Sequence, residues 1–146
     1  MTFERIRDND YCFACGGQNP LGLHLQFSRD GGMLKATCRP GCHHQGYEGI
    51  LHGGIVATIL DDTMSNLVAR VFGAATVTAE LTVRLRRPVK VERALIAEAE
   101  MADHRGRVFT VRATLKAEGS DEIVAEAESR MVKVSPSKAG SPLPAD

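Results

Sequence analysis

A short glycine turn followed by a long apolar segment holds the residues best suited to chemistry in this 146-residue chain. His52, Gly53 and Gly54 form the turn, and Asp61 and Asp62 lie in the middle of the apolar segment. If the segment is a helix, its N-terminus offers free backbone N–H groups and the positive end of the helix dipole. A carbonyl group can approach closely because glycine has no side chain. Such a turn can polarise a carbonyl, and a carboxylate can activate water or act as a nucleophile.

The apolar segment has the residue spacing of a helix with one buried side. The stripe consists of Val56, Ile59, Leu60, Leu67 and Val71, with Ile55, Met64 and Val68 at its edges. We expect a helix that begins near Gly53 and ends near Gly73, since glycine is a common helix stop. At about 100° per residue, Asp61 and Asp62 lie on opposite flanks of the stripe, so helical geometry does not choose between them. For either residue, the plain alternative is a solvated helix carboxylate.

Six further segments alternate apolar and polar residues, as strands with one buried face do. Residues 23–27 and 34–38 precede the helix, and the turn at 30–32 favours a hairpin between them. The strands expected after the helix are 77–86, 95–101, 109–117 and 123–131, with the short connections that antiparallel neighbours allow. Only the long helix is available to cover the sheet. The sequence therefore predicts an α+β fold, in which a curved antiparallel sheet of about five to six strands wraps a long central helix.

Composition sets the domain boundaries and excludes some functions. Residues 1–22 form a leader and a turn-rich segment with cysteines, 23–134 form the main domain, and 135–146 form a tail expected to be disordered. Lys plus Arg and Asp plus Glu both number 18, and aromatic residues make up 5%, which argues against a nucleic-acid-binding protein. No apolar run approaches the ~20 residues of a membrane helix, and no signal-peptide core is present at the start. We expect a cytoplasmic protein without membrane contact.

The cysteines leave two interpretations open. In a cytoplasmic protein they are thiols or metal ligands rather than disulfides. Cys12 and Cys15 form a C-x-x-C pair, and with His43 or His44 they could hold a structural zinc ion, which takes four such ligands. The later part of the chain lacks a second C-x-x-C, and Cys38 has the alternation of a small core residue. Zinc therefore stays an alternative, and we expect no required cofactor.

The order of elements and the segment H-G-G-I-V-A-T-I-L-D together resemble the hotdog-fold acyl-CoA thioesterase superfamily. More narrowly, they resemble its HGG-motif branch of the phenylacetate-pathway type, in which an acidic residue lies nine positions after the histidine, as Asp61 does after His52. The segments C-x-x-C-G-x-x-N-P-x-G-L and H-Q-G-Y-x-G also resemble one branch of these proteins, and the match covers 23–134. The resemblance implies a hotdog fold and hydrolysis of a small or medium acyl- or aryl-CoA thioester. Coenzyme A is then part of the substrate.

The resemblance also distributes roles among the motif residues. It makes Asp61 the general base or the nucleophile, whereas Asp62 keeps the solvated interpretation. The amide of Gly53, with that of Gly54, is expected to polarise the thioester carbonyl. His52 is not usually the chemical base in this family, and we expect it to shape the turn by a hydrogen bond to nearby backbone.

Two positions depart from the family pattern. Where some relatives carry an Asn before the motif, this sequence has Gly46, and Gln45 is the nearest amide that could replace it. A Ser or Thr at the start of the following strand contributes in some members, and Thr78 matches it by counting. Alternation puts Val77 and Ala79 on the apolar face and Thr78 opposite it. Thr78 is therefore a plain strand residue unless a bulge intervenes or the site lies at a subunit boundary.

The remaining expectations concern charge, assembly and alternative functions. The cations Arg84, Arg86, Arg87 and Lys90 could bind the phosphates of coenzyme A, or they could form a solvated strand end. The resemblance implies a homodimer with sites at the interface, and a dimer of dimers is expected. The alternatives to hydrolysis are a hotdog dehydratase or hydratase for 3-hydroxyacyl thioesters, with His52 and Asp61 as its pair, and a non-catalytic acyl-CoA-binding module.

Overall fold

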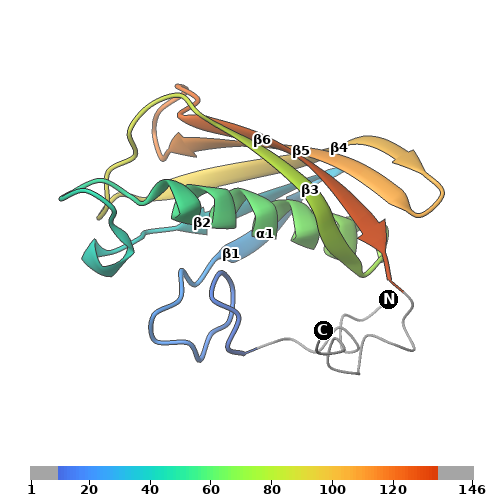
Figure 1. Cartoon of the computed structure of the whole chain (residues 1–146), viewed down its shortest axis with the longest axis horizontal. Helices are drawn as coiled ribbons and strands as arrows, with labels where there is room; N and C mark the ends of the chain where they lie inside the picture. Colours follow the sequence, from blue (N-terminus) through green and yellow to red (C-terminus); the bar gives the residue numbers. More distant parts are fainter. Residues whose placement is uncertain (1–9, 135–146) are drawn as a thin grey trace.

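One long helix packs against a six-stranded antiparallel sheet in the computed structural model of the chain (Figure 1). The structure describes residues 10–134, so the first part of the predicted leader and the predicted tail at 135–146 lie outside the described residues. The helix is α1 (Gly53–Phe72). The strands are β1 (Gln26–Asp30), β2 (Met33–Cys38), β3 (Thr76–Leu85), β4 (Leu95–Arg105), β5 (Val108–Ala117) and β6 (Ala125–Lys133). This arrangement is the predicted α+β fold.

The predicted helix ends are confirmed. Gly73 ends α1 in the left-handed conformation, at φ 69°, which glycine adopts without strain. Its N–H donates to the carbonyl oxygen of Ala69 at 3.1 Å, and the N–H of Ala74 donates to that of Val68 at 3.3 Å. These bonds satisfy carbonyls that the last helical turn leaves open.

The apolar stripe of α1 forms the core together with one face of the sheet. The buried helix residues are Val56, Ile59, Leu60, Thr63, Met64, Leu67, Val68 and Ala69. Val71, predicted within the stripe, is only partly buried, whereas the predicted edge residues Met64 and Val68 are fully buried. Thr63 is tolerated at this depth because its hydroxyl donates to the carbonyl oxygen of Ile59 at 2.6 Å. The stripe is therefore rotated slightly from its predicted centre.

The strand order is β1-β2-β4-β5-β6-β3. The predicted hairpin between β1 and β2 is confirmed, with Gly31 at φ 60° in its turn. The first strand was predicted at 23–27 but begins at Gln26, because His24 at φ 53° interrupts the extended backbone. Leu23 and Leu25 are still buried, although they precede the strand.

The four strands after the helix were predicted to pair in chain order, as a meander, with β3 beside β4. This pairing of β3 is wrong. Strands β4, β5 and β6 form a meander, but β3 pairs with β6 at the edge of the sheet. The connection from β3 to β4 does not turn back, because its backbone bonds the loop that precedes α1. The N–H of Leu51 donates to the carbonyl oxygen of Val89 at 2.7 Å, and the N–H of Val91 donates to that of Gly49 at 3.1 Å.

A β-bulge changes which side chains of β3 face the helix. The β3–β6 register shifts between Thr78 and Glu80, so Ala79 has no direct partner. Thr78 pairs with Met131, whose side chain is fully buried on the helix side of the sheet. Val77 is 41% exposed. The prediction that Val77 and Ala79 point toward the core is therefore wrong, and Thr78 takes the inward position.

No helix among residues 10–134 is long and apolar enough to cross a membrane.

The packing of α1 against the sheet makes a direct prediction. Leu60 is completely buried, so Leu60→Ala should lower the free energy of unfolding by about 2–5 kcal/mol. Leu21→Ala is the control, since Leu21 is 62% exposed and its truncation should change stability by less than about 0.5 kcal/mol. Urea denaturation at one fixed protein concentration measures both. Equal losses in the two variants would contradict the observed core.

Candidate active site

The turn before α1 has one free backbone donor. His52 is the N-cap, and its Nδ1 accepts a hydrogen bond from the N–H of Gly54 at 2.9 Å. This is the turn-shaping geometry expected for His52, and it engages the amide of Gly54, which was a predicted second donor. The N–H of Gly53 has no hydrogen-bond partner among the described residues. The carbonyl-polarising group that the helix N-terminus can supply is therefore the Gly53 amide.

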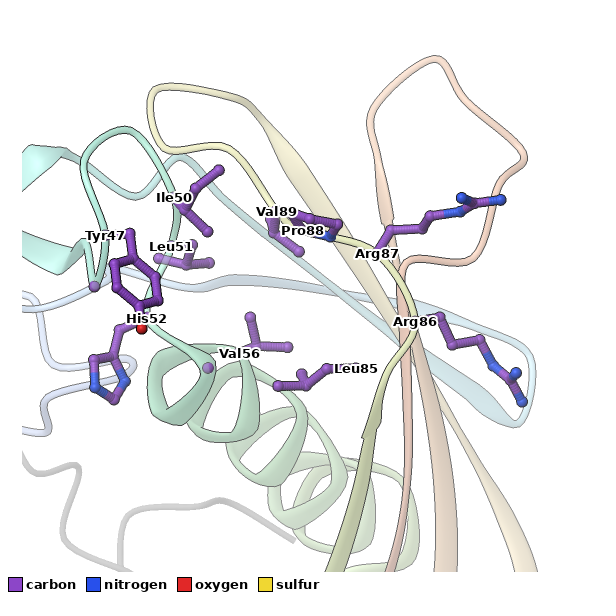
Figure 2. A pocket seen from close by; sticks show the side chains of 12 residues that line it. Tyr47, Ile50, Leu51, His52, Val56, Leu85, Arg86, Arg87, Pro88 and Val89 are labelled. Atoms are coloured by element: carbon purple, nitrogen blue, oxygen red, sulfur yellow. The ribbon is translucent and has the colours of Figure 1, made fainter.

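That amide lies at a cavity of about 590 Å³ at the start of α1 (Figure 2). The cavity is lined by Gly46, Tyr47, Ile50, Leu51, His52, Gly53, Val56, Leu85, Arg86, Arg87, Pro88 and Val89. Leu51, Val56 and Leu85 gather around the first helical turn in Figure 2. Most of the lining is apolar, and the loop before α1, the helix and the end of β3 all contribute to it. An apolar cavity with a few polar groups is the usual form of a small-molecule site.

Two of the four predicted cations, Arg86 and Arg87, line this cavity, and both already have carboxylate partners. Arg86 pairs with Glu126, and Arg87 Nε lies 2.7 Å from Glu122 Oε1. Both arginine side chains extend away from the apolar lining in Figure 2. The hydrogen bond from Arg86 holds the pKa of Glu126 below its usual range. Two of the four predicted phosphate-binding cations therefore already have carboxylate partners.

The other two predicted cations, Arg84 and Lys90, do not line the cavity. Arg84 lies opposite Glu126 in the β3–β6 ladder, and the backbone of Lys90 forms a bridge with Ile50.

Gln45 also lies outside the cavity lining. Its Oε1 accepts a hydrogen bond from the N–H of Gly49 at 3.1 Å, which braces the loop. Gly46 lines the cavity, and a side chain there would begin 3.4 Å from the Cα of His52. The structure thus gives Gln45 a loop-bracing contact, and a Cβ at Gly46 would be in ordinary van der Waals contact with His52.

Asp61 is held by the strand that the bulge reorients. The hydroxyl of Thr78 donates to Asp61 Oδ1 at 2.8 Å. A bulge was one condition under which Thr78 was expected to reach the site, and the bulge between Thr78 and Glu80 meets it. Asp61 is partly exposed on the flank of α1 that faces β3. The Asp61 carboxylate can therefore contact solvent or a substrate while the hydrogen bond from Thr78 fixes its orientation.

Asp62 lies on the opposite flank, as the helical wheel predicted. Its Oδ1 is 3.9 Å from Cys12 Sγ, and its Oδ2 accepts a hydrogen bond from Asn66 Nδ2 at 3.2 Å. Burial raises the pKa of Asp62, and the charge of Asp61 adds to this, against the opposing hydrogen bond from Cys15. The interpretation of Asp62 as a solvated carboxylate is wrong. In the sequence, only the nine-residue spacing from His52, supplied by the family resemblance, separated the two aspartates.

Neither histidine proposed as a zinc ligand joins Cys12 and Cys15 in a cluster of possible metal ligands among the described residues. His44, in the short 3₁₀ helix η2 (Cys42–His44), is 5% exposed. Its Nδ1 accepts from the N–H of Gly41 at 3.1 Å, and its Nε2 lies 2.7 Å from the carbonyl oxygen of Leu21. His43 packs on His44, with ring centroids 3.9 Å apart. Both ring nitrogens of His44 therefore hold the loop in place.

Comparison with known proteins identifies the family. The model of the thioesterase superfamily matches residues 48–124, which is more than half of the chain and includes α1 and its N-terminal turn. The chain belongs to the thioesterase superfamily, and its fold is the hotdog fold of that family.

Relatives and solved structures agree with this assignment. Acyl-coenzyme A thioesterase THEM4 of Bos taurus is 24% identical over 131 residues, which cover 88% of this chain and 54% of the relative. The chain thus spans about half the length of the curated relatives it matches. A phenylacetic acid degradation-related protein from Ralstonia eutropha has a TM-score of 0.68 at 23% identity, with 77% of this chain and 86% of that chain covered.

A second structure is that of smu.793 from Streptococcus mutans bound to acetyl CoA. Its TM-score is 0.68 at 22% identity, and the alignment covers 75% of this chain and 88% of that chain. At these identities the likeness shows the fold.

The N-cap predicts the effect of changing His52. His52→Ala removes the acceptor for the Gly54 amide and should lower the free energy of unfolding by about 0.5–2 kcal/mol. His52→Asn places another good N-cap acceptor there and should retain most of that stability. Urea denaturation of both variants measures the difference. Equal stability of His52→Ala and the unmodified chain would show that the cap contributes nothing.

Proposed function

We propose that this chain is an acyl-CoA thioesterase that hydrolyses a small or medium acyl- or aryl-CoA thioester, as the phenylacetate-pathway type of the superfamily does. The proposal rests chiefly on the hydrogen bond from Thr78 to Asp61, which orients one carboxylate on a helix whose N-terminal amide faces an apolar cavity. The names of the THEM4 relatives and the acetyl-CoA complex of smu.793 support the same substrate class.

Thioester hydrolysis needs a polarised carbonyl, an activated water and a departing thiolate. The Gly53 amide supplies the first by donating to the carbonyl oxygen at the positive end of the α1 dipole. Asp61 supplies the second, either as a base that takes a proton from water or as a nucleophile that attacks the carbonyl carbon. Thr78 occupies Oδ1 of Asp61 and leaves Oδ2 available for either task. A thiolate is a good leaving group and needs no strong acid.

One chain does not bring these two groups to one carbonyl. Gly53 and Asp61 are eight residues apart on α1, which is about 12 Å along the helix axis. A base and an oxyanion donor for the same carbonyl must both lie within hydrogen-bond reach of the reacting atoms. The complete site in this proposal therefore combines the Gly53 turn of one copy with the Asp61–Thr78 pair of another.

Strand β3 is the surface that supports such a dimer. It is a ten-residue edge strand, and edge strands are normally covered in native proteins. Leu81 and Leu85 are 36% and 56% exposed, although they lie opposite the buried residues Ser129 and Ala125. A second copy related by a two-fold axis would cover this strand and form two equivalent sites. A dimer of dimers is the expected larger assembly.

The phosphates of coenzyme A would meet the cationic segment 84–90 near the cavity. Arg84 and Lys90 form no ion pair within the part of the chain that the structure describes, whereas Arg86 and Arg87 must exchange glutamate partners for phosphate. Arg84 and Lys90 are therefore the better candidates of the four.

The dehydratase alternative finds no support in the geometry. It requires a histidine base beside a carboxylate. His52 Nδ1 accepts the N–H of Gly54 and caps α1, so this ring nitrogen is already engaged and does not serve as a base. A non-catalytic binding module would keep the cavity but release no thiol.

Asp61 provides the direct test of the activity. The unmodified chain should release thiol from at least one member of a panel of short, medium and arylacetyl-CoA thioesters, followed with a thiol reagent. Asp61→Asn should lower kcat by about 10²–10⁴-fold, because it removes the base or nucleophile. Thr78→Val should lower kcat by about ten- to a hundred-fold, and Thr78→Ser should retain most of it.

Asp30→Asn is the matched control, since Asp30 is an exposed carboxylate at the β1–β2 hairpin. Its kcat should equal that of the unmodified chain. Thiol release from none of the thioesters would refute hydrolysis for that panel. Full activity in Asp61→Asn would refute the role of this residue.

Gly53 tests the oxyanion donor separately from folding. Gly53 is the first helical residue, where proline is well tolerated, and His52 at ψ 133° has the backbone that precedes proline readily. Gly53→Pro removes the N–H donor, adds a ring next to Leu85, and should lower kcat by about 10²–10³-fold. Gly53→Ala keeps the N–H and brings a Cβ 2.9 Å from Leu85 Cδ1, a mobile side-chain end. Circular dichroism checks that both variants are folded. Equal kcat values in the two folded variants would rule out the Gly53 amide as the donor.

A further inference from the structure

Three potential metal ligands meet on the flank of α1 opposite Asp61. Cys12, Cys15 and Asp62 each offer one ligand atom, and these atoms all lie within 4.8 Å of one another. Cys12 Sγ is 3.4 Å from Cys15 Sγ and 3.9 Å from Asp62 Oδ1. Ligands of one tetrahedral zinc ion lie about 3.8 Å apart for two sulfurs and about 3.5 Å for a sulfur and an oxygen. The observed separations differ from these by only a few tenths of an ångström.

The C-x-x-C turn is built tightly around the first sulfur. The N–H of Cys15 donates to Cys12 Sγ at 3.4 Å, and the N–H of Gly16 donates to the carbonyl oxygen of Cys12 at 2.8 Å. A Cβ at Gly16 would lie 2.4 Å from Cys12 N and 2.5 Å from Asp10 O, so the turn requires glycine there. The turn therefore fixes Cys12 Sγ beside Cys15, before any metal is bound.

The carboxylate is oriented by its own neighbours. Asn66 Nδ2 donates to Asp62 Oδ2 at 3.2 Å and to the backbone oxygen of Asp62 at 2.8 Å. Arg70 Nε in turn donates to Asn66 Oδ1 at 3.0 Å. These hydrogen bonds along one face of α1 leave Oδ1 of Asp62 directed at Cys12. Metal ligands are commonly fixed by such outer hydrogen bonds.

We infer that Cys12, Cys15 and Asp62 bind one zinc ion, with a water molecule as the fourth ligand. Binding releases the two thiol protons to solvent and forms two zinc–sulfur bonds and one zinc–oxygen bond. Two thiolates favour zinc over magnesium or calcium, which prefer oxygen ligands. The inference is independent of the thioesterase proposal, because none of its ligands belongs to the Asp61–Thr78 pair or to the Gly53 turn.

Zinc at this position would fasten the N-terminal segment to the middle of α1. The ligands come from residues 12–15 and from the helix, which are about fifty residues apart in sequence but adjacent in space (Figure 1). Asp62 is next to Asp61 in the chain and faces the other way. The ion would therefore support the helix from the flank opposite Asp61.

Zinc binding to the full chain tests the inference. Reduced, chelator-treated protein is titrated with zinc against a chromogenic competitor, and one equivalent should bind per chain. Cys12→Ser, Cys15→Ser and Asp62→Asn should each weaken binding at least about ten-fold. Cys42→Ser and Asp30→Asn are the matched controls and should bind zinc like the unmodified chain, because both residues are exposed and neither is a ligand. Magnesium should not compete.

Cobalt substitution gives a second readout that does not depend on activity or on variant stability. Cobalt in the unmodified chain should give thiolate-to-cobalt charge-transfer absorption, and zinc should displace it. Less than about a tenth of an equivalent of bound zinc would overturn the inference. A Cys12–Cys15 disulfide in place of bound metal, seen by intact mass, would also overturn it.

Discussion

The burial of one apolar stripe of α1 against the sheet constrains everything else in this molecule. The stripe, centred on Ile59, Leu60 and Met64, is fully buried, so the helix cannot rotate without exposing its core. Two flanks remain for polar chemistry. Consecutive aspartates at the edges of the stripe must diverge, and they do: Asp61 turns to β3 and Asp62 turns to the N-terminal cysteines. Their different surroundings follow from a rotation of about 100° between neighbours.

Much of the fold could be predicted because its signals are local. The alternation of the strands, the helical stripe and the glycine that ends α1 are each readable within a few residues, and all three are found. The partner of β3 was not predictable from short connections. Val89, Val91 and Glu92 form backbone hydrogen bonds with the loop before α1, which are tertiary contacts with no sequence period.

The site was predicted less completely for the same reason. The bulge at Ala79 shifts the register by one residue, and such a slip moves every side chain to the other face. The bulge brings Thr78 to Asp61, whereas strand alternation alone placed Thr78 on the opposite face of the sheet. The partners of Asp62 depend on a turn fifty residues earlier in the chain, so no local pattern could indicate them. Gln45 and the histidines of η2 were plausible by type, but their hydrogen bonds go to the loop itself.

The central claim is that α1 supplies both the oxyanion donor and the carboxylate, at a separation that requires two chains. Mixing two inactive variants, Asp61→Asn and Gly53→Pro, tests it most directly. If the copies exchange freely, half of the dimers contain one copy of each variant. In each mixed dimer one of the two sites is intact, because it combines the unchanged Gly53 of one copy with the unchanged Asp61 of the other. About a quarter of the activity of the unmodified dimer should therefore return. Native mass spectrometry confirms the exchange. Mixed dimers that are no more active than either parent would contradict a site shared between chains.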